Sequence, residues 1–130
     1  MSAMQRTKGQ TGERGIAALI RDLTGWNAQR RVRQHGGDSD LLGVPGWAIE
    51  VKRHKAAPRG HIARWWRQTV EQAGQDVPVL FYRADRDQWR AVWPVTVTLV
   101  QQRADYWRGY EWTCDTAVPA WAGVAREIER

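Results

Sequence analysis

The sequence is poor in cysteine and contains no long apolar run. Cys114 is the single cysteine among 130 residues, so no disulfide can form within the chain, and no Cys/His cluster has the spacing of a zinc site. No segment approaches the roughly 20 apolar residues that span a bilayer, and the polar stretch 1–10 lacks the apolar centre of a signal peptide. These absences argue against disulfide scaffolds and membrane spans, and we expect a cytoplasmic protein.

Positive charge is concentrated in the first half of the chain. Residues 1–67 hold 13 Lys and Arg against 5 Asp and Glu, whereas residues 68–130 hold 7 against 9. A segregated positive field suits a polyanion such as DNA, because each phosphate contact releases a condensed counterion. A merely soluble basic surface explains the charge equally well.

Tryptophan is unusually frequent, with nine residues in a chain long enough for one domain only. Tryptophan can stack on unpaired bases, which would suit a single-strand binder. It is also a large core residue. Several tryptophans, among them Trp65 and Trp66, recur at periodic positions, and this favours core packing for most of them.

An apolar stripe at helical spacing predicts a first helix, and its members are Ile16, Leu19, Ile20 and Leu23. Thr11 is the expected N-cap and Gly25 the glycine that ends the helix. Glu13 then falls in the first turn, at the edge of the apolar stripe. We expect its side chain to lean towards the margin of the core.

The next segments alternate as strands do. Residues 28–34 and 40–42 are strand-like, residues 43–46 form a tight turn, and residues 47–52 place Glu50 and Lys52 on one face. This hairpin would bring Asp40 near Glu50. A second helix at 62–73, strands at 77–83 and 88–93 and a terminal helix at 118–130 follow. The order predicts an α/β fold with a mixed central sheet flanked by helices.

Asp40 and the run Glu50-Val51-Lys52 carry the chemistry. Two carboxylates on neighbouring strands supply the hard oxygen ligands that Mg²⁺ prefers, and the backbone carbonyl of Val51 is a further ligand. Lys52 shares the face of Glu50, where its ammonium can orient a water and stabilise charge on a phosphate. Phosphodiester hydrolysis needs this combination. The Glu-x-Lys pattern alone would also suit an exposed cross-strand ion pair.

The order of these residues resembles the PD-(D/E)XK nucleases, above all archaeal-type and phage Holliday-junction resolvases and phage-associated nucleases. The resemblance rests on Lys8-Gly9, Glu13, Gly36-Gly37, Asp40 and Glu50-Val51-Lys52. Ser39 stands where the name motif has proline. The resemblance covers residues 6–94 and implies a restriction-endonuclease-like αβββαββ core. We expect one domain over residues 1–130, with a Trp-rich extension at 95–130.

Carried over by position, the resemblance implies roles for the matching side chains. The predicted metal ligands are Glu13, Asp40, Glu50 and Val51, for Mg²⁺ with Mn²⁺ as a substitute. The predicted catalytic residues are Glu13, Asp40, Glu50, Lys52 and Gln68, and the residues expected to bind DNA are Arg6, Lys8, Arg30, Arg33, Arg53, Lys55 and Arg64. Gln68 matches a polar position that many relatives use, although a solvated helix flank is equally consistent. Asp38 is a rival ligand to Asp40.

We therefore predict a metal-dependent DNA endonuclease, resembling a Holliday-junction resolvase that acts on branched DNA. The alternatives are a phage nuclease of duplex or single-strand specificity and a non-catalytic DNA-binding module on a nuclease fold. A nuclease that loses its activity in evolution normally loses a metal ligand or the lysine. Here all four positions are filled, by Glu13, Asp40, Glu50 and Lys52.

The C-terminal aromatics suggest assembly. Trp107, Tyr110, Trp112 and Trp121 lie outside the resemblance, and a small domain is not expected to bury nine tryptophans. Aromatic residues are enriched at interfaces. We predict that part of this tail forms an isologous homodimer contact. Alternatively, the tail folds back over a sheet face of its own chain.

Overall fold

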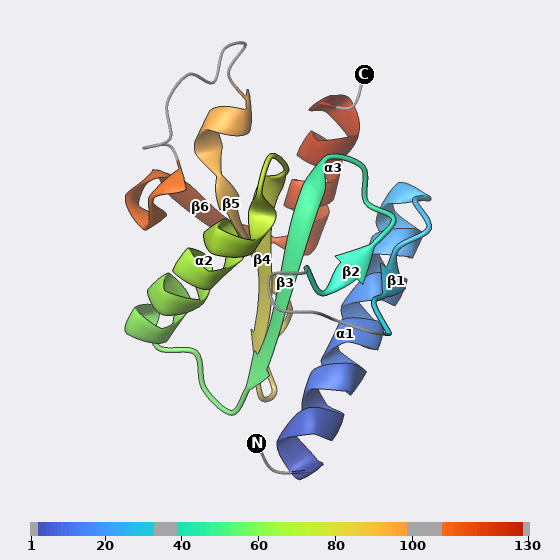
Figure 1. Ribbon diagram of the computed structural model, residues 1–130, viewed down its shortest axis with the longest axis vertical. Coiled ribbons are helices and arrows are strands. Elements are labelled where there is room, and N and C mark those ends of the chain that lie inside the picture. Colours follow the sequence, from blue (N-terminus) through green and yellow to red (C-terminus); the bar gives the residue numbers. More distant parts are fainter. Residues whose placement is uncertain (1–2, 33–38, 99–107, 129–130) are drawn as a thin grey trace.

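The computed structural model describes residues 3–32, 39–98 and 108–128, without the side chains of residues 3–7. A four-stranded mixed sheet forms the middle of its three layers. Helices α1 (Ala3–Thr24) and α3 (Val118–Ile128) cover one face of the sheet, and α2 (Arg59–Ala73) covers the other (Figure 1). This arrangement confirms the predicted fold class. None of the helices in these ranges is long and apolar enough to cross a membrane.

The sheet has the order β3 (Trp47–His54), β4 (Val77–Ala84), β5 (Arg90–Pro94), β6 (Thr113–Ala117). Strands β3 and β4 are parallel, as the intervening helix α2 requires, and the other pairs are antiparallel. A short 3₁₀ segment follows β5 at Val95–Thr98, and another precedes β6 at Tyr110–Trp112. The predicted C-terminal extension thus contributes a strand to the sheet.

Helix α1 begins well before the predicted N-cap, so the expectation for Thr11 is wrong. Gly12 lies inside the helix, where an added Cβ would come within 3.2 Å of the Cβ of Arg53 and 3.4 Å of the ring of Trp89. Close packing against the sheet thus stabilises the helical conformation around Gly12, where the local helix propensity is low. The predicted end is confirmed, because Gly25 follows the helix with a φ of 79°.

Strands β1 (Gln29–Arg30) and β2 (Leu41–Leu42) form a separate two-stranded antiparallel sheet. The strand predicted at 28–34 is therefore only two residues long within the described part of the chain. The predicted hairpin is also looser than expected, since β2 pairs with β1 rather than forming a ladder with β3. One backbone hydrogen bond, from the amide of Asp40 to the carbonyl of Ile49 at 2.8 Å, joins the two arms.

Alternation along β3 is as predicted, and it divides the core in two. Trp47, Ile49 and Val51 pack on the side of α1 and α3, whereas Glu50 and Lys52 lie on the side of α2. Because α2 packs over this second face, Glu50 is only 5% exposed. A carboxylate at this position is thus held out of bulk water by the fold itself.

Among the C-terminal aromatics, Trp121 folds back on its own chain. Trp121 is fully buried and meets Trp47 and Phe81 edge to face, at centroid distances of 5.5 and 4.9 Å. The expectation that this small core could not hold such residues is wrong for Trp121. Trp112 is 40% exposed, and Trp107 lies outside the described residues.

Candidate active site

The site is built where the residue before β2 meets the middle of β3. The amide of Val51 donates a hydrogen bond of 2.7 Å to Oδ2 of Asp40, and the carbonyl of Asp40 accepts a bond of 3.0 Å from the amide of Arg31. Asp40 is 8% exposed. Backbone donors and acceptors on both sides therefore fix this carboxylate beside Glu50, as the sequence predicted.

Asp40 and Glu50 are close enough to share a side-chain hydrogen bond. Burial, the negative charge of Asp40 and a hydrogen bond with Asp40 together raise the pKa of Glu50 to about 8, although Lys52 opposes the shift. Glu50 therefore keeps its proton near neutral pH, beside the carboxyl group of Asp40. A cation placed between them would take over the role of that proton.

Lys52 lies beside Glu50, on the same face of β3. Its Nζ lies 3.5 Å from Oε1 of Glu50, and its side chain is 21% exposed against 7% for that of Glu50. The ammonium therefore stands between the buried carboxylates and solvent, from where a substrate would approach.

Glu13 lies next to this pair but is held by a cation. Its Oε2 accepts a hydrogen bond of 2.8 Å from Nε of Arg30. Burial raises its pKa, with a further contribution from the charge of Asp40, while Arg30 lowers it. Glu13 thus belongs to the same electrostatic environment as Asp40. Its role as a metal ligand stays a prediction.

The donor set suits a divalent cation. Among the described residues, no group of three His, Cys, Asp or Glu side chains is placed to hold a metal ion. In the same part of the chain, Oε2 of Glu50 is buried and has no hydrogen-bond partner. Mg²⁺ is usually bound by one or two carboxylates, with waters and substrate phosphates completing its octahedron. Asp40 and Glu50 fit that pattern, and the carbonyl of Val51 remains a predicted third oxygen.

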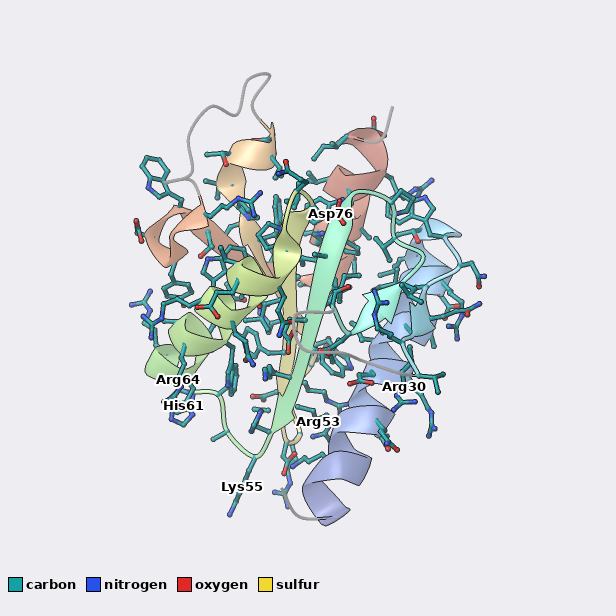
Figure 2. The ribbon with its side chains drawn as sticks, in the orientation of Figure 1. Arg30, Arg53, Lys55, His61, Arg64 and Asp76 are labelled. Atoms are coloured by element: carbon teal, nitrogen blue, oxygen red, sulfur yellow. The ribbon has the colours of Figure 1, made fainter. Side chains whose placement is uncertain are left out.

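Cationic side chains gather at the carboxyl ends of β3 and β4 and near the start of α2 (Figure 2). Lys55 and Arg64 are exposed there. Lys8 and Arg53 both bind Asp85, at 2.8 and 2.6 Å. With Arg30, which is paired with Glu13, three of the predicted DNA contacts are thus already paired with an acid.

The remaining predicted residues are placed as follows. Gln68 is exposed on α2, which is consistent with either of its two interpretations. The side chain of Arg6 and the whole of Arg33 and Asp38 lie outside the described residues.

Sequence patterns missed two groups that the fold assembles. Asp85, in the connection between the strands predicted at 77–83 and 88–93, binds two cations, and hydrogen bonds from Lys8 and Arg53 lower its pKa to about 2. Asp115 of β6 accepts hydrogen bonds from the hydroxyl of Tyr82 at 2.5 Å and from Nε of Arg90 at 2.8 Å. These pairings depend on strand register and turn geometry, for which the sequence has no local signal.

Comparison with protein families identifies the chain. A family described as "Phage putative PDDEXK endonuclease" matches residues 4–116. The chain belongs to this family. The matched range includes Asp40, Glu50 and Lys52, and it extends beyond Pro94, where the sequence resemblance ended, into β6.

The PDDEXK assignment agrees with the comparison of folds. The structure is similar to that of Hjc, a Holliday junction resolvase from the archaeal hyperthermophile Archaeoglobus fulgidus, with a TM-score of 0.55 and 22% sequence identity. The match covers 89% of this chain and 96% of that one. No curated protein matches the chain. At this identity the likeness to Hjc shows a shared fold.

Proposed function

We propose that this PDDEXK family member is a metal-dependent DNA endonuclease that cuts branched DNA. One observation carries the proposal: Asp40 and Glu50 form a buried carboxylate pair with Lys52 at its solvent side. Membership of an endonuclease family supports hydrolysis of a phosphodiester bond.

Each residue of the site has a distinct task in this proposal. Asp40 and Glu50 hold a divalent cation, Mg²⁺ or Mn²⁺. When bound, such a cation supplies Lewis-acid chemistry and neutralises charge on the scissile phosphate. Lys52 orients the attacking water from its position beside Glu50, and its positive charge stabilises the phosphate as negative charge develops there.

Glu13 has an indirect role in this scheme. It holds Arg30 at the margin of the site, where the guanidinium can also meet the DNA backbone. The exposed cations Lys55 and Arg64 contact phosphates further along the strand, and Gln68 is a candidate for positioning the substrate.

Branched DNA is the proposed substrate because the fold is shared with a Holliday junction resolvase. Paired cuts across a junction require two sites at a fixed separation, which a two-fold dimer provides. Val95 and Trp112 are each 40% exposed and flank the paired residues Pro94 and Thr113 at one end of β5 and β6. We infer that this apolar pair belongs to an isologous homodimer contact.

A panel of labelled DNAs tests the activity. A four-way junction, a flap, a duplex and a single strand are incubated with the wild type and with Asp40→Asn and Glu50→Gln, in Mg²⁺, in Mn²⁺ and in chelator. We expect junction cleavage by the wild type in either metal and none in chelator, with rates reduced by orders of magnitude in both variants. Cleavage of duplex or single strand alone would point to a simpler phage nuclease. Binding without cleavage of any DNA would point to a non-catalytic module.

Sedimentation equilibrium tests the dimer separately. The wild type at micromolar concentration should sediment as a dimer, and Trp112→Ala should shift it towards the monomer. Trp26→Ala, which removes a partly buried tryptophan elsewhere, is the matched control. A monomeric wild type would end the dimer proposal.

A further inference from the structure

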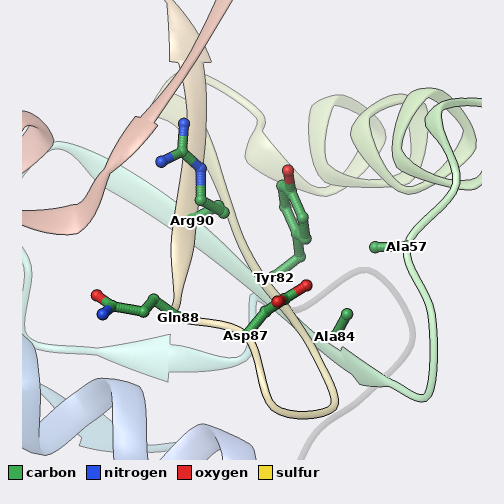
Figure 3. A pocket seen from close by; sticks show the side chains of 6 residues that line it. All are labelled: Ala57, Tyr82, Ala84, Asp87, Gln88 and Arg90. Atoms are coloured by element: carbon green, nitrogen blue, oxygen red, sulfur yellow. The ribbon is translucent and has the colours of Figure 1, made fainter.

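A cavity of about 340 Å³ lies on the α2 side of the sheet, beside the candidate active site. Six residues line it: Ala57, Tyr82, Ala84, Asp87, Gln88 and Arg90. Figure 3 shows Tyr82 and Arg90 rising from neighbouring strands, with Ala57 facing them from the loop before α2. The cavity is within the size range of small-ligand sites.

Strand register links the cavity to Lys52. Lys52 is the partner of Tyr82 across β3 and β4, and Tyr82 is the partner of Arg90 across β4 and β5. The three residues therefore form one row across the same face of the sheet. Neighbouring strands lie about 5 Å apart, so the cavity starts one strand away from the residue proposed to serve the reacting water.

The walls of the cavity are held in place by β6. Asp115 accepts a hydrogen bond from the hydroxyl of Tyr82 at 2.5 Å, one from Nε of Arg90 at 2.8 Å, and its carbonyl accepts one from Nη2 of Arg90 at 2.9 Å. Side chains fixed in this way lose little conformational freedom when a ligand binds.

The lining has the chemistry of a nucleobase site. Tyr82 offers an aromatic ring, while Gln88 offers both a donor and an acceptor. Arg90 forms an ion pair with Asp115, and Asp87 adds a second acid to the lining, so the cavity is not strongly cationic, as a phosphate site would be. A planar heterocycle with mixed donors and acceptors satisfies such a lining.

We propose that this cavity receives one unpaired nucleobase of the DNA substrate, close to the scissile phosphate, with the base against Tyr82. The inference rests on the proposed nuclease function and narrows its substrate. A base inside a duplex cannot reach such a cavity, because it would first have to leave the stack. The enzyme would then prefer branched DNA that carries an unpaired nucleotide beside the cleavage site, such as a flap or a bulged junction.

The test compares two DNAs that differ by one base. Both are duplexes with a single unpaired nucleotide, which in one of them lacks its base and carries a tetrahydrofuran ring instead. Affinities are measured by fluorescence anisotropy for the full-length protein in chelator, where no cleavage occurs. Base–aromatic contacts predict that the wild type binds the intact DNA about 5- to 100-fold more tightly than the abasic DNA.

Variants of the cavity should remove this preference. Tyr82→Leu should bind both DNAs alike, at the affinity of the wild type for abasic DNA, whereas Tyr82→Phe should keep most of the preference. Tyr110→Leu is the matched control, since Tyr110 is also partly buried on the α2 side but does not line the cavity. If Tyr82→Leu fails to fold by circular dichroism, Gln88→Ala, in an exposed position, replaces it and should weaken binding only to the intact DNA.

The outcomes are separable from those of the cleavage panel. Equal affinity of the wild type for both DNAs, or an undiminished preference in Tyr82→Leu, overturns the nucleobase cavity while leaving the nuclease proposal intact. A base preference that depends on Tyr82, in a protein that cuts no DNA, keeps the cavity and removes the nuclease proposal.

Discussion

The carboxyl groups of Asp40 and Glu50 lie side by side, although they reach the site from different segments of the chain. Asp40 is held by the amide of Val51, and Glu50 is buried under α2. Burial beside a second acid favours the protonated form of Glu50, and the same geometry favours a divalent cation.

Lys52→Ala should separate chemistry from binding. Its Nζ lies 3.5 Å from Oε1 of Glu50, so its loss should lower the cleavage rate at saturating DNA by at least about 100-fold, while affinity changes little. Lys55→Ala makes the same change at an exposed position and should do the reverse, with lower affinity and a salt slope reduced by about one unit. Single-turnover cleavage and anisotropy measure the two effects. Equal losses of affinity in both variants would reduce Lys52 to an electrostatic contact.

The unfolding free energy of the metal-free protein should fall as pH rises from about 4.5 to about 8. The pKa of Glu50 is raised to about 8 from an ordinary value of 4.5, so in this window the folded state holds a proton that the unfolded state has lost. The loss should approach about 1.4 kcal/mol per pH unit. Glu50→Gln should flatten the dependence. Urea denaturation in chelator at a series of pH values measures this pH dependence. If the unfolding free energies of the wild type and of Glu50→Gln changed in parallel with pH, the raised pKa of Glu50 would be contradicted.

Asp85→Asn should strengthen DNA binding. Asp85 engages both Lys8 and Arg53, and its removal frees two cations at the carboxyl ends of β3 and β4. Affinity should rise, and the salt slope should steepen by about one to two units. Asp76→Asn makes the same charge change at the opposite end of these strands and serves as the control (Figure 2). The same gain in both variants would show a general effect of net charge.

Gly43→Ala should destabilise the segment that presents Asp40. Gly43 has a φ of 89°, and an added Cβ would lie 2.1 Å from the carbonyl oxygen of Asn27. Gly46 has a φ of 77° but open space around it. Gly46→Ala should therefore cost about 1–2 kcal/mol of backbone strain, and Gly43→Ala should cost more, because the backbone must also move. Thermal unfolding of both variants measures the two losses of stability. Equal losses would contradict the close contact between residue 43 and the carbonyl oxygen of Asn27.

Local patterns were sufficient for most of the elements and for the acidic pair. Alternation over 47–52 put Glu50 and Lys52 on one face, and the tight turn before it brought Asp40 close. The start of α1 was wrong, because the packing of Gly12 against Arg53 is a tertiary contact that no local rule contains. Alternation and helical spacing are properties of neighbouring residues, and so the sequence reports them directly.

The sequence by itself determined the fold class, most of the helices and strands, the charge segregation and the residues of the Asp/Glu-x-Lys constellation. Tertiary structure alone decided that Asp85 neutralises Lys8, that Trp121 enters the core, and that Tyr82 and Asp115 meet beside the site. Each of these contacts joins residues far apart in the chain. Their partners are selected by strand register and by burial of apolar faces, which exist only once the sheet has formed.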